Sequence, residues 1–358
     1  MPEEGFYNGP MQSRPIEAQK RAVFEARLLE KAIVPNSLGR LGELAVRLAL
    51  IKEGPLTAPM HLLFASDHGI TEEGVTHSPR EITAQQCRSF AQGGGACSLF
   101  CRLGGIEQRV IDVGVDYLFD EGEAIIDHKV RRGTRNFLYE RAMTEAECRS
   151  AMEAGRQCTR DAISDGCDVI IFGEMGVGNT TSASAIASAL LDRDPSQVTG
   201  KGSGLSDAEL EGKVAVIRRS LTVHRERSPL GVLEAFGGFE IAAIVGGILE
   251  AAANGVVIII DGVPVSAAAL IAQRIDRAVT DSLICAHRSA MTGHDLILEA
   301  LGCPPPLLDL LMQLGEGTGA LAAWPLVRLA SHLLTDLTSF EEAGVTDSTR
   351  ILQERGLL

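Results

Sequence analysis

The sequence predicts an α/β protein, in which a parallel β-sheet is flanked by helices and both ends of the chain are helical. Three observations predict this fold class. Leucines recur at helical spacing near the N-terminus, short apolar runs alternate with alanine-rich segments in the middle, and helical spacing returns after Pro306. The length of 358 residues exceeds what one core usually organises, so we expect about two domains.

The N-terminal part is expected to be helical over residues 17–52, where Leu41, Leu44 and Leu48 recur at spacings of three and four. Ser37 stands where an N-cap residue is expected. At the other end we expect helices over residues 307–314 and 320–334, with a glycine-rich break between them. The two helical ends together suggest a second, small domain made from both termini.

The middle of the chain contains five apolar runs that are too short to be helices and read as buried strands. Alanine-rich segments lie between them, at 182–191 and 265–275 for example, as expected of crossover helices on a parallel sheet. Because polar residues follow the runs and the carboxyl ends of parallel strands share one edge, the sequence predicts a ligand site at that edge. The runs are residues 61–65, 109–113, 168–172 and 256–260, with a weaker fifth at 283–286.

Composition argues against several classes of partner. The chain has 33 basic and 47 acidic residues, a net charge of −14, so a broad surface for nucleic acid or anionic membrane is not expected. Residues 1–12 lack the pattern of a secretory signal, and the most apolar segment, 241–264, is broken by charged and polar residues. We therefore expect a cytoplasmic protein without a membrane role.

The eight cysteines and eight histidines are scattered along the chain. They form neither a Cys-x-x-Cys pair nor a His-Glu-x-x-His motif. We expect reduced, mostly buried thiols and no metal site.

The most informative motif reads Gly-Glu-Met-Gly-Val-Gly-Asn-Thr-Thr over residues 173–181, between a predicted strand and a predicted helix. Glycines let the backbone approach a ligand, and N–H groups and hydroxyls at a helix start suit a phosphate or carboxylate. It is not a P-loop, because no Gly-Lys-Ser/Thr follows, and it lacks the third glycine of the dinucleotide fingerprint. A tight turn without a ligand is the alternative, but Glu174 and the threonine pair favour a ligand loop.

A second glycine-rich segment, residues 200–207, carries Lys201 and is followed by Lys213. Two lysines beside a flexible turn can supply the cation that a phosphate site needs in an acidic protein. An ordinary surface loop explains the composition equally well.

A third segment, residues 314–319, places Glu316 between two glycines just before a predicted helix. A carboxylate with so little bulk around it is open to a substrate, which suits a general base. The alternative is a glutamate that merely favours a helix N-terminus.

A fourth segment, Ser66-Asp67-His68-Gly69, ends a predicted strand. Asp67 and His68 are chemically able to pair or to bind a metal, but side chains of sequence neighbours diverge at a strand end. A structural use of His68 is the commoner expectation.

Four stretches together resemble the nicotinate-nucleotide:dimethylbenzimidazole phosphoribosyltransferase family. They occur in the family's order within roughly residues 15–340. The stretches are residues 173–181, Gly-Gly-Phe-Glu-Ile-Ala at 237–242, Ile-Asp-Gly with Ala-Ala-Ala-Leu-Ile-Ala at 260–272, and Leu-Gly-Glu-Gly-Thr-Gly-Ala at 314–320.

The resemblance implies an enzyme of cobalamin nucleotide-loop assembly. Such an enzyme transfers the phosphoribosyl group of nicotinate mononucleotide to 5,6-dimethylbenzimidazole or a related base, giving α-ribazole 5′-phosphate and nicotinate. No cofactor is implied, and no magnesium, because no pyrophosphate leaves. It also implies a cytoplasmic homodimer with a large Rossmann-like nucleotide-binding domain, here residues 56–302, and a small helical domain, here residues 1–55 and 303–358, whose second part begins with the catalytic loop.

Site residues follow from the resemblance position by position. Glu316 matches the family's general base, and Glu174 matches a second carboxylate beside the ribose. The positions that match nucleotide-binding residues are Gly176, Gly178, Asn179, Thr180, Gly202, Ser203, Gly204, Lys213, Asp261, Ser289 and Gly317, and those that match base-binding residues are Ser78, Gln86, Met175 and Leu314.

Two positions depart from the family's usual pattern. Ser66 stands where glycine commonly precedes Asp-His-Gly, and Ser289-Ala290-Met291-Thr292 stands where Ser-Ala-Glu is usual. Alternatives therefore stay open: the same reaction with adenine or a phenolic acceptor, a non-catalytic nucleotide-binding paralogue, or another Rossmann-type enzyme acting on a nucleoside or sugar phosphate.

Overall fold

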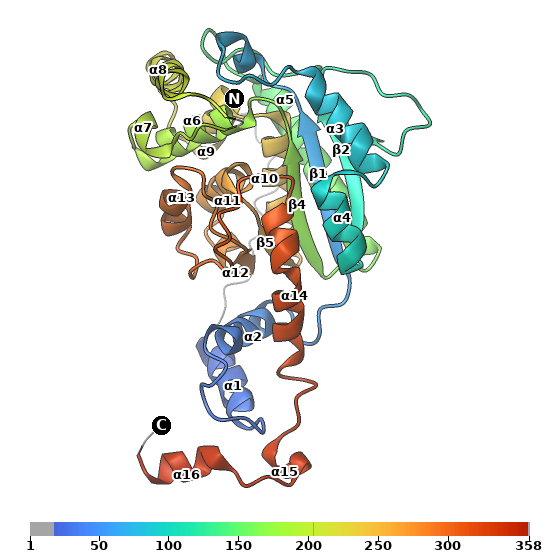
Figure 1. Ribbon diagram of the computed structural model, residues 1–358, viewed down its shortest axis with the longest axis vertical. Coiled ribbons are helices and arrows are strands. Elements are labelled where there is room, and N and C mark those ends of the chain that lie inside the picture. The colour runs from blue at the N-terminus through green and yellow to red at the C-terminus, as the bar shows by residue number, and fades with distance from the viewer. Residues whose placement is uncertain (1–17, 203, 357–358) are drawn as a thin grey trace, which may run out of the picture.

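A computed structural model describes residues 18–202 and 204–356 and shows a six-stranded sheet in the order β3-β2-β1-β4-β5-β6 (Figure 1). Every pairing in the sheet is parallel, as expected from the continuous apolar runs. The sequence predicts five of the strands and misses β3, which is only two residues long and exposed. The strands are β1 Pro59–Ser66, β2 Glu107–Gly114, β3 Ile126–Asp127, β4 Val169–Met175, β5 Val257–Ile260 and β6 Leu283–Cys285.

Helices cover both faces of the sheet, and alternate residues of β1 show how. Leu62 and Phe64 point into the larger core, formed with α5, α6, α9, α10, α11 and α13. Leu63 and Ala65 point into a second core, formed with α2, α3, α4 and α14. The covering helices are α3 Glu81–Ala91, α4 Gly95–Gly104, α5 Glu145–Ser164, α6 Asn179–Leu191, α9 Pro229–Phe236, α10 Phe239–Ala253, α11 Val263–Ile275, α13 His294–Leu301 and α14 Thr318–His332.

Shorter or peripheral helices complete the large body. The longest of them, α8, starts at a capping box, in which the Ser206 hydroxyl and the Glu209 carboxylate satisfy each other's backbone N–H groups. These elements are the 3-10 helix η1 Gly69–Glu73, α7 Pro195–Val198, α8 Asp207–Val223 and α12 Val279–Ser282.

The two ends of the chain lie together below the sheet (Figure 1), where α14 packs on α2 and α2 packs on α1. A β-bridge between Lys31 and Ser339 joins the two ends directly. The domain boundaries at residues 55 and 302 stay a prediction. The helices of this part are α1 Ala18–Leu29, α2 Arg40–Ile51, α15 Phe340–Ala343 and α16 Ser348–Glu354, together with the lower half of α14.

The structure corrects two predicted elements. Residues 307–314 do not form a helix, because the segment lies beside the strand end: Leu308 forms a β-bridge with His287, and the Ala290 N–H donates to the Met312 carbonyl. The apolar spacing of this segment suits a helix, but these backbone hydrogen bonds hold it beside the strand end instead. Ser37 is not an N-cap either, since α2 begins at Arg40 after Gly39, and no side chain caps it.

The polar residues that follow the strands gather at one edge, as predicted. Register brings Glu174 level with Phe64 of β1, and Asp112 level with Ala65. Asp261 and His287 follow β5 and β6, which are paired up to Ile260 and Cys285. In the described part of the chain, no helix combines the length and apolarity needed to cross a bilayer.

Candidate active site

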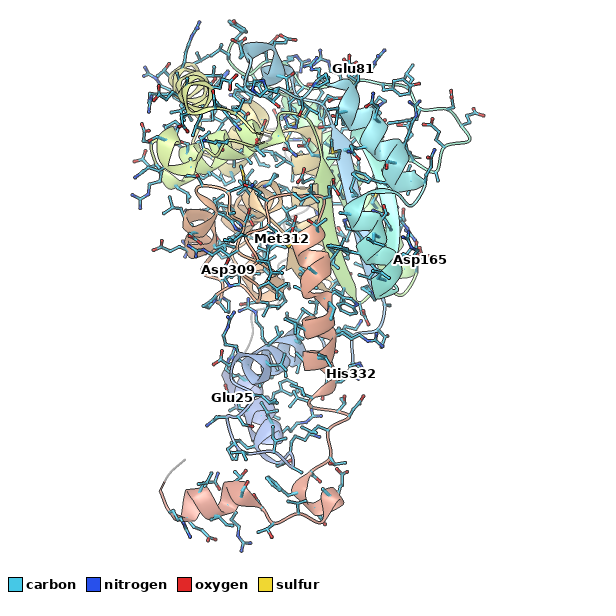
Figure 2. All side chains as sticks on the ribbon, in the orientation of Figure 1. Glu25, Glu81, Asp165, Asp309, Met312 and His332 are labelled. Atoms are coloured by element: carbon cyan, nitrogen blue, oxygen red, sulfur yellow. The ribbon has the colours of Figure 1, made fainter. Side chains whose placement is uncertain are left out.

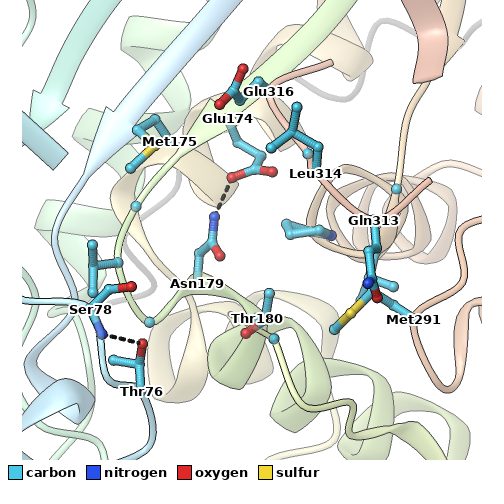
Figure 3. Close-up of a pocket in the computed structure, with 18 of the residues that line it drawn as sticks. Thr76, Ser78, Glu174, Met175, Asn179, Thr180, Met291, Gln313, Leu314 and Glu316 are labelled. Carbon is cyan, nitrogen blue, oxygen red and sulfur yellow. Dashed lines mark hydrogen bonds between the residues drawn. The ribbon is translucent and has the colours of Figure 1, made fainter. Parts of the chain in front are cut away.

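A cavity of about 380 Å³ opens at this edge of the sheet (Figure 3). It is lined by the loop after β1, the start of α3, the turn from β4 into α6, and the segments that follow β5 and β6. Lys213 of α8 and residues 313–316 close it. Segments far apart in the sequence therefore build one site.

Most of the predicted site residues line this cavity. Gly204, Asp261 and Gly317 do not line it, and Ser203 lies outside the described residues. The predicted residues that line it are Ser78, Gln86, Glu174, Met175, Gly176, Gly178, Asn179, Thr180, Gly202, Lys213, Ser289, Leu314 and Glu316.

The turn from β4 into α6 requires its glycines. Gly178 has a φ of 96° and is the N-cap of α6, a conformation that side chains other than glycine's rarely adopt. A Cβ at Gly176 would collide with the backbone carbonyl of Ser66. The loop is thereby fixed against the end of β1.

His68 packs against this loop, next to Gly176 and Gly178, and does not line the cavity. Its fully buried ring bonds the Ser182 hydroxyl at 2.9 Å through Nδ1 and the Glu240 carboxylate at 2.7 Å through Nε2. The Ser66 hydroxyl donates to the same carboxylate. Ser66, the first departure from the family pattern, thus serves the packing beneath the site.

Glu174 is the more enclosed of the two predicted catalytic carboxylates. It lies on β4 with 5% of its surface exposed, and the amide of Asn179 donates to Oε2. Burial, followed by the nearby carboxylates of Asp261, Glu240 and Glu316, raises the pKa of Glu174 well above its usual range. A positive charge bound here would favour the ionised form.

Glu316 lies next to Glu174 and also lines the cavity (Figure 3). It lies just before α14 and has a φ of 60°, a left-handed conformation that costs a non-glycine residue energy. Its side chain is nearly buried, Oε2 has no hydrogen-bond partner in the part of the chain that the structure describes, and burial raises the pKa of Glu316. An unpartnered carboxylate oxygen with a raised pKa is suited to accept a proton.

Lys213 supplies a positive charge to the cavity, beside Thr180. It is 2% exposed, and Nζ donates to the Thr180 hydroxyl at 3.0 Å and to the Gly200 carbonyl at 3.3 Å. Burial lowers the pKa of Lys213 to about 8. Because no carboxylate of the described residues is bonded to this ammonium, a bound anion would satisfy it.

Asp261 acts on the site without lining it. Its Oδ1 accepts the N–H groups of Gly319 at 2.8 Å and Ala320 at 3.2 Å, and thus caps α14. The same oxygen lies 3.1 Å from Nε2 of His287. The resemblance places Asp261 among nucleotide-binding residues, whereas the geometry makes it the anchor of the Glu316 loop.

The other two predicted residues outside the cavity are Gly317 and Gly204, and both have a positive φ. Gly317 is the N-cap of α14 with a φ of 77°, and a Cβ there would press on the ring of His61. Gly204 has a φ of 99°, and a Cβ there would meet nothing within 4 Å.

Several lining residues were not predicted. His287 follows the weakest predicted strand. Its position after that strand, at the predicted ligand edge of the sheet, could have indicated that it lines the site. Gln313 was hidden by the helix wrongly expected over residues 307–314. Met291, the second departure from the family pattern, lines the cavity, as do Val75, Thr76, Ile82, Val177, Gly262, Val263, Pro264 and Gly315. Lys201, which the sequence offers as a cation for a phosphate, also lines it.

The comparisons with known proteins agree with this geometry. A family model described as phosphoribosyltransferase matches residues 13–345. The nicotinate-nucleotide–dimethylbenzimidazole phosphoribosyltransferase of Geobacter sp. (strain M21) is 41% identical over 339 residues, which are 93% of this chain and 97% of that protein. The enzyme of the same name from Ralstonia nicotianae is 44% identical over 318 residues, 87% of this chain and 90% of its own length.

Among solved structures, the crystal structure of CobT from Thermus thermophilus superposes with a TM-score of 0.88 at 38% identity, covering 92% of this chain and 99% of that one. The parallel sheet, the cavity at its carboxyl edge and the family match define an enzyme of the phosphoribosyltransferase class. Within that class, the chain belongs to the nicotinate-nucleotide–dimethylbenzimidazole phosphoribosyltransferase family.

Proposed function

We propose that this enzyme transfers the phosphoribosyl group of nicotinate mononucleotide to 5,6-dimethylbenzimidazole or a related base, in cobalamin nucleotide-loop assembly. The products are α-ribazole 5′-phosphate and nicotinate. The observation that carries the proposal is one cavity lined by two buried carboxylates, Glu174 and Glu316, and by the buried Lys213. The names of the relatives support the choice of substrates.

The donor substrate has charges that complement this cavity. Its 5′-phosphate takes the place beside Lys213, Thr180 and Gly202, where the ammonium has no anionic partner within the described part of the chain. Gly202 has a φ of 60°, and a Cβ there would lie 3.6 Å from Nζ of Lys213, close to the space that the phosphate needs. Its N-glycosidic pyridinium is a cation, which lies toward the carboxylates.

The transfer is one displacement at C1′. A ring nitrogen of the acceptor forms the new bond to C1′ while the bond from C1′ to the nicotinate nitrogen breaks, and the electron pair leaves with the neutral pyridine ring. Attack from the face opposite to nicotinate converts the β linkage into the α linkage.

The two carboxylates have different parts in this step. Glu316 accepts the proton of the azole N–H, which prevents positive charge from building up on the attacking base. Glu174, ionised once the cationic donor is bound, stabilises positive charge at C1′ as the bond to nicotinate lengthens.

The acceptor base lies against the remaining wall. Met175 and Leu314 supply apolar surface, while Ser78 and Gln86 supply polar groups for a heterocycle. Met291 lies on the same cavity, where the family pattern has a charged residue. Adenine and phenolic acceptors are the alternatives, and kcat/KM measured over a panel of acceptors separates them from benzimidazoles.

We further propose that the enzyme is a cytoplasmic homodimer. Leu310, Leu311 and Leu314 are 60%, 76% and 57% exposed beside the cavity, an apolar surface that a second copy of the chain would cover. Sedimentation analysis of the purified protein tests the dimer, and a monomer at micromolar concentration would contradict it.

The test of function incubates the purified protein with nicotinate mononucleotide and 5,6-dimethylbenzimidazole without added metal. Chromatography follows nicotinate release and the new nucleotide, whose linkage is assigned by NMR. An α-linked product supports the proposal. Binding of nicotinate mononucleotide without turnover of any benzimidazole, adenine or phenol would instead indicate a non-catalytic paralogue.

A further inference from the structure

The Glu316 loop, residues 313–316, lies between two anchors, one at each end. Gln313, Leu314 and Glu316 of this loop line the cavity (Figure 3). The loop belongs neither to a strand nor to a helix, because it follows β6 and ends before α14 begins at Thr318. Its position therefore depends on the hydrogen bonds that hold its two ends.

The first end of the loop is held by the segment that follows β6. The Met312 carbonyl accepts hydrogen bonds from the Ser289 hydroxyl at 3.2 Å and from the Ala290 N–H at 3.0 Å. Ser289 is buried and lines the cavity. These two bonds fix the backbone one residue before the Glu316 loop begins.

The second end of the loop is held by Asp261, which follows β5. Its Oδ1 accepts the N–H groups of Gly319 and Ala320 at the start of α14. A Cβ on Gly319 would collide with the ring of His287, so the start of α14 is also closely packed. The backbone is thus fixed on both sides of Glu316.

The two anchors are joined by His294, a fully buried side chain at the start of α13. Its Nδ1 accepts the backbone N–H of Ser289 at 2.9 Å, and its Nε2 lies 3.0 Å from the Ser266 hydroxyl. That hydroxyl donates to the backbone carbonyl of Asp261 at 3.1 Å. One chain of hydrogen bonds therefore runs from Ser289 through His294 and Ser266 to Asp261.

The direction of each bond in this chain is fixed. A backbone N–H can only donate, so Nδ1 of His294 is unprotonated and the proton of the neutral ring is on Nε2. Nε2 then donates to the Ser266 hydroxyl, which uses its own proton for the Asp261 carbonyl. Burial lowers the pKa of His294 to about 4, so the ring is neutral at neutral pH.

We propose that His294 is a positioning residue, which places Glu316 for proton transfer by joining the two anchors of its loop. The proposal rests on the proposed function, because it assumes that Glu316 accepts the proton of the attacking base. His294 does not line the cavity, so it acts through the residues that it bonds. A misplacement of about 1 Å can cost a catalytic group about 10²-fold in rate, so a loosened loop should be visible in kcat.

The first experiment replaces His294 by leucine, which fills a similar volume and has neither ring nitrogen. We expect kcat to fall about 10²-fold in His294→Leu, with KM for nicotinate mononucleotide within about 3-fold of wild type. The control is His224→Leu. His224 is also hydrogen-bonded, to the Phe137 carbonyl at 2.9 Å, but it does not line the cavity, and its variant should keep wild-type kinetics.

Conservative variants test the bonds of the chain one at a time. The side-chain oxygen of asparagine reaches about as far as Nδ1, so His294→Asn keeps an acceptor for the Ser289 N–H. The amide of glutamine reaches about as far as Nε2, so His294→Gln keeps a donor for the Ser266 hydroxyl. Each should recover part of the kcat that is lost in His294→Leu. Ser266→Ala removes one hydroxyl and little volume, and kcat should fall about 10-fold.

A double-mutant cycle separates positioning from a general loss of structure. If His294 acts through Glu316, His294→Leu should lower kcat much less in a Glu316→Gln background than in the wild type. Circular dichroism and melting curves identify any variant that does not fold. If the leucine variant does not fold, Ser266→Ala takes its place in the cycle.

The outcomes are distinct. The positioning role is wrong if the folded leucine variant keeps wild-type kcat, if the loss is equal in both backgrounds, or if neither the asparagine nor the glutamine variant recovers activity. Glu316→Gln alone tests the proposed function: wild-type turnover in that variant would show that the proposed base is wrong. An inactive Glu316→Gln beside a normal His294→Leu would leave the base in place and exclude only the role of His294.

Discussion

The two glycine-rich turns of the site hold their carboxylates in opposite ways. Glu174 lies on a regular strand, and Asn179, five residues along the same turn, donates to it. Glu316 lies on a left-handed backbone outside any strand, and its Oε2 has no hydrogen-bond partner among the described residues. A carboxylate that stabilises positive charge can accept a hydrogen bond from a nearby residue. A carboxylate that accepts a proton needs an oxygen without such a partner.

The sharpest test of this difference replaces each carboxylate by its amide. We expect Glu316→Gln to lower kcat by roughly 10³-fold, because an amide cannot accept the azole proton. Glu174→Gln should lower kcat by roughly 10²-fold, since only a stabilising charge is lost. Steady-state kinetics with both variants checks the order, and a larger loss in Glu174→Gln would reverse the assigned roles.

The next largest effect concerns the buried lysine of the cavity. Lys213→Met keeps the buried stem and removes the ammonium, so KM for nicotinate mononucleotide should rise by about 10- to 100-fold. Lys201→Met should raise it less, because Lys201 is half exposed and already paired with Asp207 at 2.7 Å.

The pH dependence follows from the same lysine. The protonated form binds the phosphate, and its pKa is about 8, so kcat/KM should fall as the pH rises through about 8. A profile of kcat/KM that is flat to pH 9.5 in the wild type would contradict this assignment, and the limb should be absent from Lys213→Met.

A smaller effect is proton release on donor binding. The raised pKa of Glu174 means that its carboxyl carries a proton in the free enzyme more often than an ordinary glutamate does. The pyridinium cation lowers that pKa, so binding should release protons. Calorimetry in two buffers of different ionisation enthalpy measures the release, which should shrink in Glu174→Gln; equal release in both proteins would place the proton elsewhere.

The smallest effect is on stability. Glycine adopts the left-handed backbone of residue 316 without the cost that a side chain incurs. Glu316→Gly should therefore have a free energy of unfolding about 1 kcal/mol higher than Glu316→Gln. Urea denaturation of these two variants measures the difference, and a more stable glutamine variant would show that the strain is absent.

Much of the fold could be predicted from the sequence, because its signals are local. The apolar runs predict β1, β2, β4, β5 and β6, and the alternation with alanine-rich segments predicts a parallel sheet with ligands at its carboxyl edge. The helix expected over residues 307–314 was wrong because apolar spacing does not register the backbone hydrogen bonds between residues far apart in the sequence.

The site was predictable only in part, for the same reason. The turns that contain Glu174 and Glu316 can be recognised in the sequence by their glycines. The anchoring of α14 by Asp261 depends on segments that only the folded chain brings together. No local pattern contains it.

Helix α14 joins the catalytic loop to the far end of the molecule. Its first residues are tied to Asp261, and its last, near His332, reach the region of α1 and α2 (Figure 2). Fifteen residues, with Pro325 among them, span about 22 Å, so a tilt of about three degrees about the far end displaces the loop by about 1 Å. A shift of that size is enough to cost a catalytic group about 10²-fold in rate. We therefore expect substitutions where α14 packs on α2 to change turnover, although they do not contact the substrate.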